Sequence, residues 1–111
     1  MTLQNLIWIF LGGGLGSVLR FLISKYAYPL FENFFIGTLT VNLLGSFIIG
    51  LIIGLEIKLI LQKPAMMFLA VGFCGGFTTF STFALENYNL IKSEQYLLAS
   101  VYILASVIIG I

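Results

Sequence analysis

The sequence contains very few of the side chains on which most catalytic and metal sites depend. It has one cysteine, Cys74, and no histidine among its 111 residues. These counts exclude a disulfide framework within one chain, and they exclude zinc, haem and proton-relay sites built from histidine and cysteine. No nucleophile with a base and no carboxylate pair stands out, so we do not expect an enzyme. Cys74 is most simply a small packing residue.

Charged side chains are scarce as well. Only 8% of the residues are charged and 60% are hydrophobic, which together exclude a soluble globular domain. Apolar stretches cover about 6–26, 36–56, 65–88 and 96–111, and about 20 such residues cross the ~30 Å hydrocarbon core of a bilayer. We therefore predict an all-α integral membrane protein with four transmembrane helices in one domain, 1–111.

The third apolar stretch departs from an ordinary membrane helix near its middle. Residues 75–83 read Gly-Gly-Phe-Thr-Thr-Phe-Ser-Thr-Phe. Adjacent glycines favour leaving the helix, and hydroxyl side chains bond to backbone groups in place of the helical ladder. Unpaired backbone groups at membrane depth are tolerated only where they are buried in protein or line a polar path. This stretch predicts a broken helix with an ion site or a pore; the alternative is two glycines that pack closely in an unbroken helix.

Steps of four residues place small and polar side chains on one face of each of the other helices, because residues four apart are neighbours on a helix surface. The steps are Gly12, Gly16 and Arg20; Thr38, Asn42, Ser46, Gly50 and Gly54; and Tyr102, Ser106 and Gly110. Gly12 and Gly16 predict close helix contact. Asn42 needs a partner within the span, either another helix or a polar pore, and we prefer the pore. For Arg20 we prefer a side chain that reaches the membrane interface over a buried role.

Cations are divided almost evenly between the two ends of the predicted helices. Lys58 and Lys63 lie at one end, and Arg20, Lys25 and Lys92 lie at the other. The positive-inside rule therefore gives the chain almost no preferred orientation. A chain without such a preference can insert in both orientations, which permits an antiparallel dimer. Four short helices also bury little surface between them, so we expect a functional unit of more than one copy.

The polar rows offer hydrogen-bond donors with no full cation in the middle of the span. Conduction needs sites that bind an ion favourably but weakly, so neutral donors suit a small anion. The edges of Phe80 and Phe83 carry positive partial charge and add to these donors, although two phenylalanines at helical spacing more often belong to a core. The residues alone predict a polar pore, with an anion as one candidate ion.

Three motifs resemble a known family. Residues 12–20 read Gly-Gly-Gly-Leu-Gly-Ser-Val-Leu-Arg, residues 37–47 read Gly-Thr-Leu-Thr-Val-Asn-Leu-Leu-Gly-Ser-Phe, and residues 72–83 read Gly-Phe-Cys-Gly-Gly-Phe-Thr-Thr-Phe-Ser-Thr-Phe. Together they resemble the Fluc (CrcB) fluoride channels. The resemblance implies an antiparallel, dual-topology homodimer in the inner membrane of a prokaryote, with two pores for passive export of cytoplasmic fluoride and a central structural sodium ion. It implies no organic cofactor and no nucleic-acid partner.

The resemblance also assigns roles to residues. Backbone carbonyls of Gly75 and Thr78 from both subunits would hold the sodium ion. The fluoride pore would be lined by Asn42, by the ring edges of Phe80 and Phe83, and by a polar track of Thr38, Ser81, Thr82, Tyr102 and Ser106. Arg20 would organise the pore mouth. Glu86 lies one helical turn beyond Phe83, and we expect it to reach a water-filled mouth.

Two other functions compete with a channel. A small multidrug-resistance transporter has the same size and dual topology, but it needs a carboxylate deep in the first helix, where this sequence has none. The carboxylates of Glu56 and Glu86 lie at the ends of predicted spans. A non-conducting assembly subunit would explain the paired glycines but not the run Thr-Thr-Phe-Ser-Thr-Phe.

Overall fold

The structure, a computed structural model, describes residues 2–31 and 35–111, and the side chains of all of these except 28–31. Its helices are α1 (Leu3–Phe31), α2 (Phe35–Ile57), α3 (Lys63–Met66), η1 (Met67–Cys74), α4 (Gly75–Phe77), α5 (Phe80–Lys92) and α6 (Tyr96–Gly110). η1 has π-helical winding and continues α3 directly into α4. The described ranges contain no strand, so the predicted all-α architecture is confirmed.

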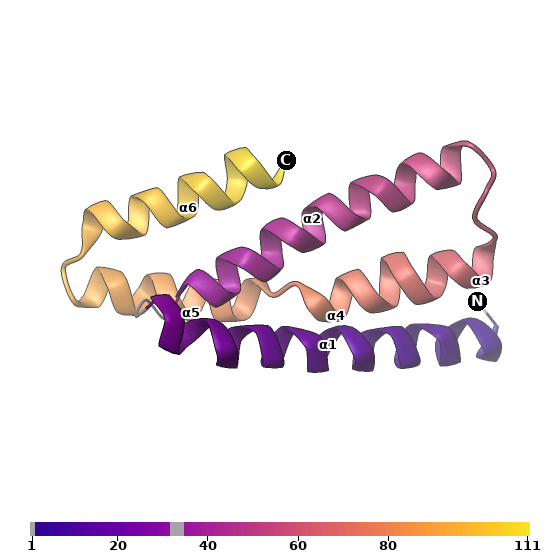
Figure 1. Ribbon diagram of the computed structural model, residues 1–111, viewed down its shortest axis with the longest axis horizontal. Coiled ribbons are helices and arrows are strands. Elements are labelled where there is room, and N and C mark those ends of the chain that lie inside the picture. The colour runs from indigo at the N-terminus through magenta and orange to yellow at the C-terminus, as the bar shows by residue number, and fades with distance from the viewer. Residues whose placement is uncertain (1, 32–34) are drawn as a thin grey trace.

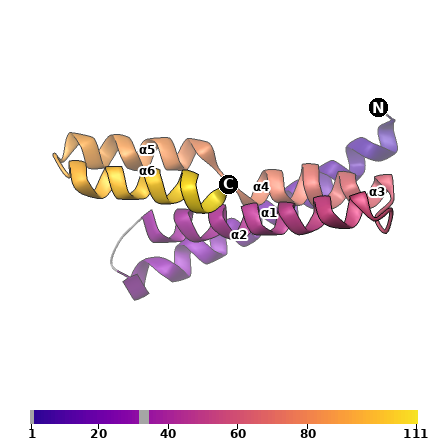
Figure 2. The same cartoon turned by 90° about the horizontal axis from the view of Figure 1, so that it is seen from above.

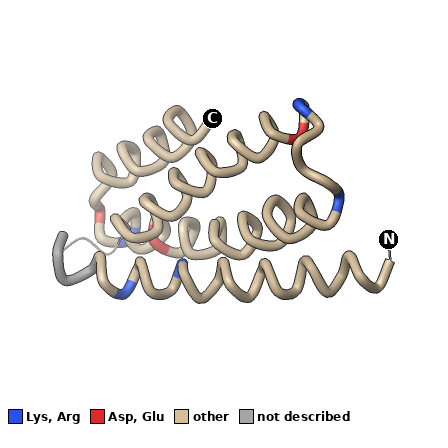
Figure 3. The backbone as a smooth tube through the Cα atoms, turned by 45° about the vertical axis from the view of Figure 1, so that its right-hand side comes forward, with Lys and Arg blue, Asp and Glu red and all other residues tan. Residues whose placement is uncertain are grey.

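Three stretches are long and apolar enough to cross a membrane. They are Leu3–Ala27, Phe35–Ile57 and Lys63–Lys92, and the shorter apolar helix Tyr96–Gly110 follows. Large hydrophobic side chains are exposed along these helices, as expected where lipid takes the place of water. Figure 3 shows the charged positions toward the two ends of the bundle, with long uncharged stretches between them. α1 is longer than the sequence predicts, since it ends at Phe31 and not near residue 26.

The helices form one elongated bundle (Figure 1). α1 lies along η1 and α4, and α2 packs on α1. α6 packs against α5 and α2. Viewed from above, α5 and α6 run side by side toward one end of the molecule, and α3 lies at the other end (Figure 2). The chain between α4 and α5 therefore sits near the middle of the bundle.

Glycines bring the backbones of α1 and η1–α4 into direct contact. A Cβ atom on Gly12 would overlap the carbonyl oxygen of Phe68, and one on Gly72 would lie 2.7 Å from the carbonyl oxygen of Ile9. A Cβ atom on Gly76 would overlap the backbone of α1. The close helix contact predicted from the glycine spacing of the first segment is therefore present.

The third predicted helix is broken between α4 and α5. Thr78 and Thr79 are extended, with φ/ψ of −88°/157° and −148°/125°. Gly75 stays helical at −62°/−39°. The predicted break is confirmed, but the glycines are not where the chain leaves the helix. The two threonines leave it, since β-branched residues fit extended backbone well, whereas Gly76 is needed for the contact with α1.

Candidate functional site

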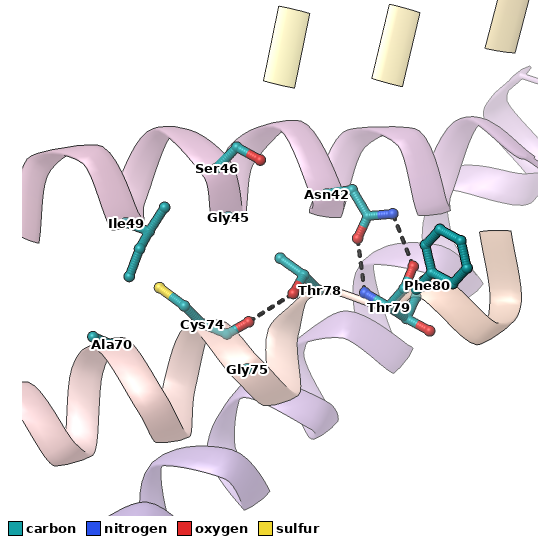
Figure 4. A pocket seen from close by; sticks show the side chains of 10 residues that line it. All are labelled: Asn42, Gly45, Ser46, Ile49, Ala70, Cys74, Gly75, Thr78, Thr79 and Phe80. Atoms are coloured by element: carbon teal, nitrogen blue, oxygen red, sulfur yellow. Dashed lines mark hydrogen bonds between the residues drawn. The ribbon is translucent and has the colours of Figure 1, made fainter. Parts of the chain in front are cut away.

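Asn42 of α2 forms two hydrogen bonds at the break, one through the nitrogen and one through the oxygen of its side-chain amide. Its Nδ2 donates to the carbonyl oxygen of Thr79 at 3.0 Å, and the Thr79 amide donates to Asn42 Oδ1 at 2.8 Å (Figure 4). The side chain thus replaces the backbone partners that Thr79 loses by leaving the helix. Of the two interpretations of Asn42, the interhelical hydrogen bond is present. It uses one of the two Nδ2 hydrogens and leaves the other for a further acceptor.

The carbonyl groups of Gly75 and Thr78 are among those that lose their helical donors at the break. In a continuous helix the Gly75 carbonyl would accept from the Thr79 amide, and the Thr78 carbonyl from the Thr82 amide. Here the Thr79 amide donates to Asn42, and the Thr82 amide donates to Thr79 Oγ1 at 3.2 Å. Both carbonyl oxygens are thereby released for another ligand. Carbonyl oxygens are ligands that hard cations accept.

Acidic side chains do not form a competing metal site in the part of the chain that the structure describes. No group of three or more His, Cys, Asp or Glu residues gathers there. Gly75 is exposed, and a Cβ atom built on it would meet no atom of the described chain within 4 Å. The Gly75 position thus faces open space outside the described chain.

Arg20 of α1 also reaches the break. Its Nε donates to the carbonyl oxygen of Gly76 at 3.0 Å, and Ser17 Oγ donates to the same oxygen at 3.4 Å. The interpretation of Arg20 that we preferred, a side chain that only reaches the interface, is therefore incomplete. The guanidinium group is half-buried and bonded at the end of α4.

Hydroxyl groups gather where α5 begins. Thr79 is the N-cap residue of α5, and its Oγ1 accepts the Thr82 amide. The same oxygen lies 3.2 Å from Ser81 Oγ and 3.3 Å from Thr82 Oγ1. Sequence reasoning included Ser81 and Thr82 but missed Thr79. A threonine directly before a helix is a common cap, and this signal would have identified Thr79 once the break had been placed on the threonines.

The two phenylalanines have different surroundings. Their ring centroids are 5.5 Å apart. Phe80 is 78% exposed, whereas Phe83 packs edge-on against the ring of Tyr102 at 5.0 Å and belongs to the edge of a small core with Phe35. Phe83 therefore packs in the core as well as lying beside the break, while Phe80 is free to contact something outside the chain.

Three polar residues are buried together where α2, α5 and α6 meet. Thr38, Glu86 and Tyr102 are 3%, 8% and 0% exposed. The Tyr102 hydroxyl donates to Glu86 Oε1 at 2.8 Å, and Thr38 is buried with them. In the single chain Glu86 thus does not reach open water, contrary to our expectation, because its hydrogen-bond partners are buried with it. Ser106 Oγ, also of α6, is buried without a partner among the described residues.

A hollow of about 400 Å³ brings part of the predicted set together (Figure 4). It is lined by Asn42, Gly45, Ser46, Ile49, Ala70, Cys74, Gly75, Thr78, Thr79 and Phe80. Gly45 allows the approach of Thr78, whose Cγ2 would overlap a Cβ atom at that position. The hollow includes the expected cation ligands and two expected pore residues. The other six expected pore residues are not part of its lining: Thr38, Ser81, Thr82, Phe83, Tyr102 and Ser106.

Comparisons with known proteins agree on one family. The family model described as "CrcB-like protein, Camphor Resistance (CrcB)" matches residues 7–111. A protein of Gloeothece citriformis named "Fluoride-specific ion channel FluC" is 46% identical over 107 residues, which covers 96% of this chain and 87% of that protein. Proteins of the same name from Serratia proteamaculans and Pyrococcus furiosus are 47% and 40% identical, covering 87% and 97% of this chain and 77% and 88% of their own length.

These relatives are named as ion channels, not as enzymes, and they match nearly the whole chain. The three long apolar helices and the motifs around the break lie within the matched residues. The chain is therefore a multi-pass membrane protein that belongs to the CrcB-like family.

Proposed function

We propose that the chain is a passive, fluoride-selective ion channel through which cytoplasmic fluoride leaves a prokaryotic cell. The observation that carries this proposal is the 40–47% identity, over most of the chain, to proteins named as fluoride-specific ion channels. Export of this kind needs no ATP hydrolysis and no coupled ion, because the membrane potential drives it. A membrane potential of 100 mV, inside negative, is worth ~2.3 kcal/mol per charge, which gives an outward bias of about fifty-fold for a monovalent anion.

The proposed pore uses neutral donors beside the break. Asn42 keeps one amide hydrogen free of its bonds to Thr79, and Phe80 stands exposed next to it in the hollow. Phe83 adds a second ring edge. The hydroxyls of Ser81 and Thr82 lie next to these groups, and the polar track of Thr38, Tyr102 and Ser106 would continue the path. The unpartnered Ser106 hydroxyl supports its place on that track.

Charged residues border this path in the proposal. Arg20 would organise the pore mouth, and its guanidinium also donates to Gly76 at the break. Glu86 would orient the Tyr102 hydroxyl, which donates to it. The alternative of a small multidrug-resistance transporter gains no support, because α1 contains no carboxylate.

The proposed functional unit is an antiparallel, dual-topology homodimer in the lipid bilayer. The hollow at the break opens to the outside of the chain, and Gly75 has free space in front of it. A second copy would cover this face and the exposed ring of Phe80. The even division of cations between the two ends of the helices supports insertion in both orientations.

The proposed cation is sodium, held at the centre of the dimer by carbonyl oxygens of Gly75 and Thr78 from both copies. The donor set fits, since both carbonyls lose their helical donors at the break, and hard cations accept such oxygens. In this site sodium would balance the carbonyl dipoles of the two copies. The residues themselves bind and orient; no bond is made or broken.

Efflux from liposomes that contain only the purified protein tests the proposed function. We expect fluoride to leave loaded liposomes when a potential is applied, and chloride to stay. A folded dimer that releases no more fluoride than empty liposomes would refute the proposal. Equal release of fluoride and chloride would refute the selectivity.

A further inference from the structure

The carbonyl of Gly76 receives stronger hydrogen bonding than the other carbonyls released at the break. The last carbonyls of a helix have no helical donor, and α4 ends directly after Gly76 at Phe77. The Gly76 oxygen accepts from the charged guanidinium of Arg20 at 3.0 Å and from the Ser17 hydroxyl at 3.4 Å. Hydrogen bonds from a charged donor are stronger than those between neutral groups. The end of α4 is therefore attached to α1 at one specific oxygen.

The position of α1 makes this attachment rigid. A Cβ atom on Gly16, one turn before Arg20, would overlap the carbonyl oxygen of Phe73 and lie 2.8 Å from the amide nitrogen of Phe77. A Cβ atom on Gly76 would overlap the backbone of α1. The two backbones are thus in contact on both sides of the hydrogen bond, and the planar guanidinium presents its donors in a fixed arrangement.

This attachment matters because glycine is conformationally free. Gly75 and Gly76 adopt helical geometry directly before the break, yet glycine reaches other conformations at little steric cost. The carbonyls of Gly75 and Gly76 belong to neighbouring peptide groups that share the Cα atom of Gly76. If the Gly76 carbonyl is released, rotation about that Cα atom can also change the direction of the Gly75 carbonyl.

We propose that Arg20, assisted by Ser17, is a positioning residue that keeps the Gly75 carbonyl directed at the cation site. The affinity for sodium then depends on a side chain that does not touch the ion. This inference rests on the cation site of the proposed function. It differs from a role at the pore mouth, because it predicts an effect on sodium binding itself.

The experiment is a sodium titration of the thermal unfolding of the purified dimer, with N-methylglucamine chloride replacing sodium chloride at constant ionic strength. The variants are Arg20→Met, Arg20→Lys and Ser17→Ala. The matched control is Lys25→Gln, which removes a cation from the same helix at an exposed position whose nearest described partner is the ring of Tyr26. Loss of a charged hydrogen bond should raise the half-maximal sodium concentration about tenfold in Arg20→Met.

We expect a shift of about threefold in Arg20→Lys and in Ser17→Ala, since each keeps a charged donor for the Gly76 carbonyl, whereas Arg20→Met keeps only the Ser17 hydroxyl. We expect no shift in Lys25→Gln. Lower stability of Arg20→Met at every sodium concentration, with an unchanged half-maximal value, would show a purely structural role and overturn the proposal. If Arg20→Met yields no dimer, unshifted values in both milder variants overturn it. If the unfolding of the parent protein does not respond to sodium, both the proposed cation site and the positioning role of Arg20 are refuted. The proposed fluoride efflux is not refuted by that result, because it is measured separately.

Discussion

Replacing Asn42 with aspartate separates the two roles of this side chain. The Thr79 amide can still donate to a carboxylate oxygen, as it does to Oδ1 at 2.8 Å. The Nδ2 donor, however, becomes a second oxygen facing the Thr79 carbonyl, where the amide nitrogen now lies at 3.0 Å. Asn42→Asp therefore keeps the shape of the side chain and the hydrogen bond from the Thr79 amide. It replaces a donor on the proposed anion path with an acceptor.

The expected magnitudes differ for folding and for flux. Losing one hydrogen bond and crowding two acceptors costs ~1–3 kcal/mol of stability, which is less than the ~5–15 kcal/mol that holds a typical domain together. An ionised carboxylate ~4 Å from a passing anion costs ~4 kcal/mol at an effective dielectric constant of ~20. A barrier raised by this amount slows passage about a thousandfold. The variant should therefore fold as a dimer and conduct very poorly.

Fluoride efflux from liposomes measures the flux, and size-exclusion chromatography with thermal unfolding measures the fold. Asn89→Asp is the matched control, because it makes the same chemical change at an exposed position of α5 and should leave efflux unchanged. Near parental flux in a well-folded Asn42→Asp dimer would show that Asn42 only holds the break and that the anion passes elsewhere.

Three further outcomes are expected. Gly76→Ala should lower the free energy of unfolding by ~1–3 kcal/mol, because its Cβ atom would overlap the backbone of α1. Gly14→Ala, whose Cβ atom would meet no described atom within 4 Å, should be neutral by thermal unfolding, and equal effects of the two substitutions would contradict the packing. Gly75→Ala should leave the helix content of the chain unchanged but weaken the dimer, and crosslinking yield reports this; an intact dimer would place Gly75 away from the interface. Phe80→Ile should reduce efflux with little loss of stability, whereas Phe83→Ile should reduce both, since only Phe83 packs against the core; equal stability losses would be inconsistent with this difference.

Hydropathy alone located the long helices well, because a membrane span is defined by the length and composition of one continuous stretch. The break was also visible in the sequence, in the run of glycines and threonines that begins at residue 75, but the sequence did not show which of these residues leave the helix. Two adjacent glycines look the same in a sequence whether they end a helix or allow another backbone to approach closely. Only the contact of Gly76 with α1 distinguishes the two, and that contact depends on a segment far away in the chain.

The hydrogen-bond partners of the polar side chains could not be predicted from the sequence, for a related reason. Helical periodicity says which residues share a face, but it does not say which way that face turns in the bundle. The periodicity placed Asn42 on a polar face, but it did not identify Thr79 as the residue to which the amide bonds across the bundle. Glu86 was expected near water, and the pairing with Tyr102 that buries it joins two helices. Such pairs follow from how the helices are rotated, which only the folded structure specifies.

The hydrogen bonds at the break also have an order in time. Arg20 and Asn42 lie in α1 and α2, and the groups that they bind, in Gly76 and Thr79, come later in the chain. Chains are synthesised from the N-terminus, and earlier segments begin to fold first. A backbone group that enters the bilayer unpaired costs several kcal/mol. Since its partners precede it on the ribosome, the broken helix arrives in a membrane where the donors and acceptors it needs are already in place.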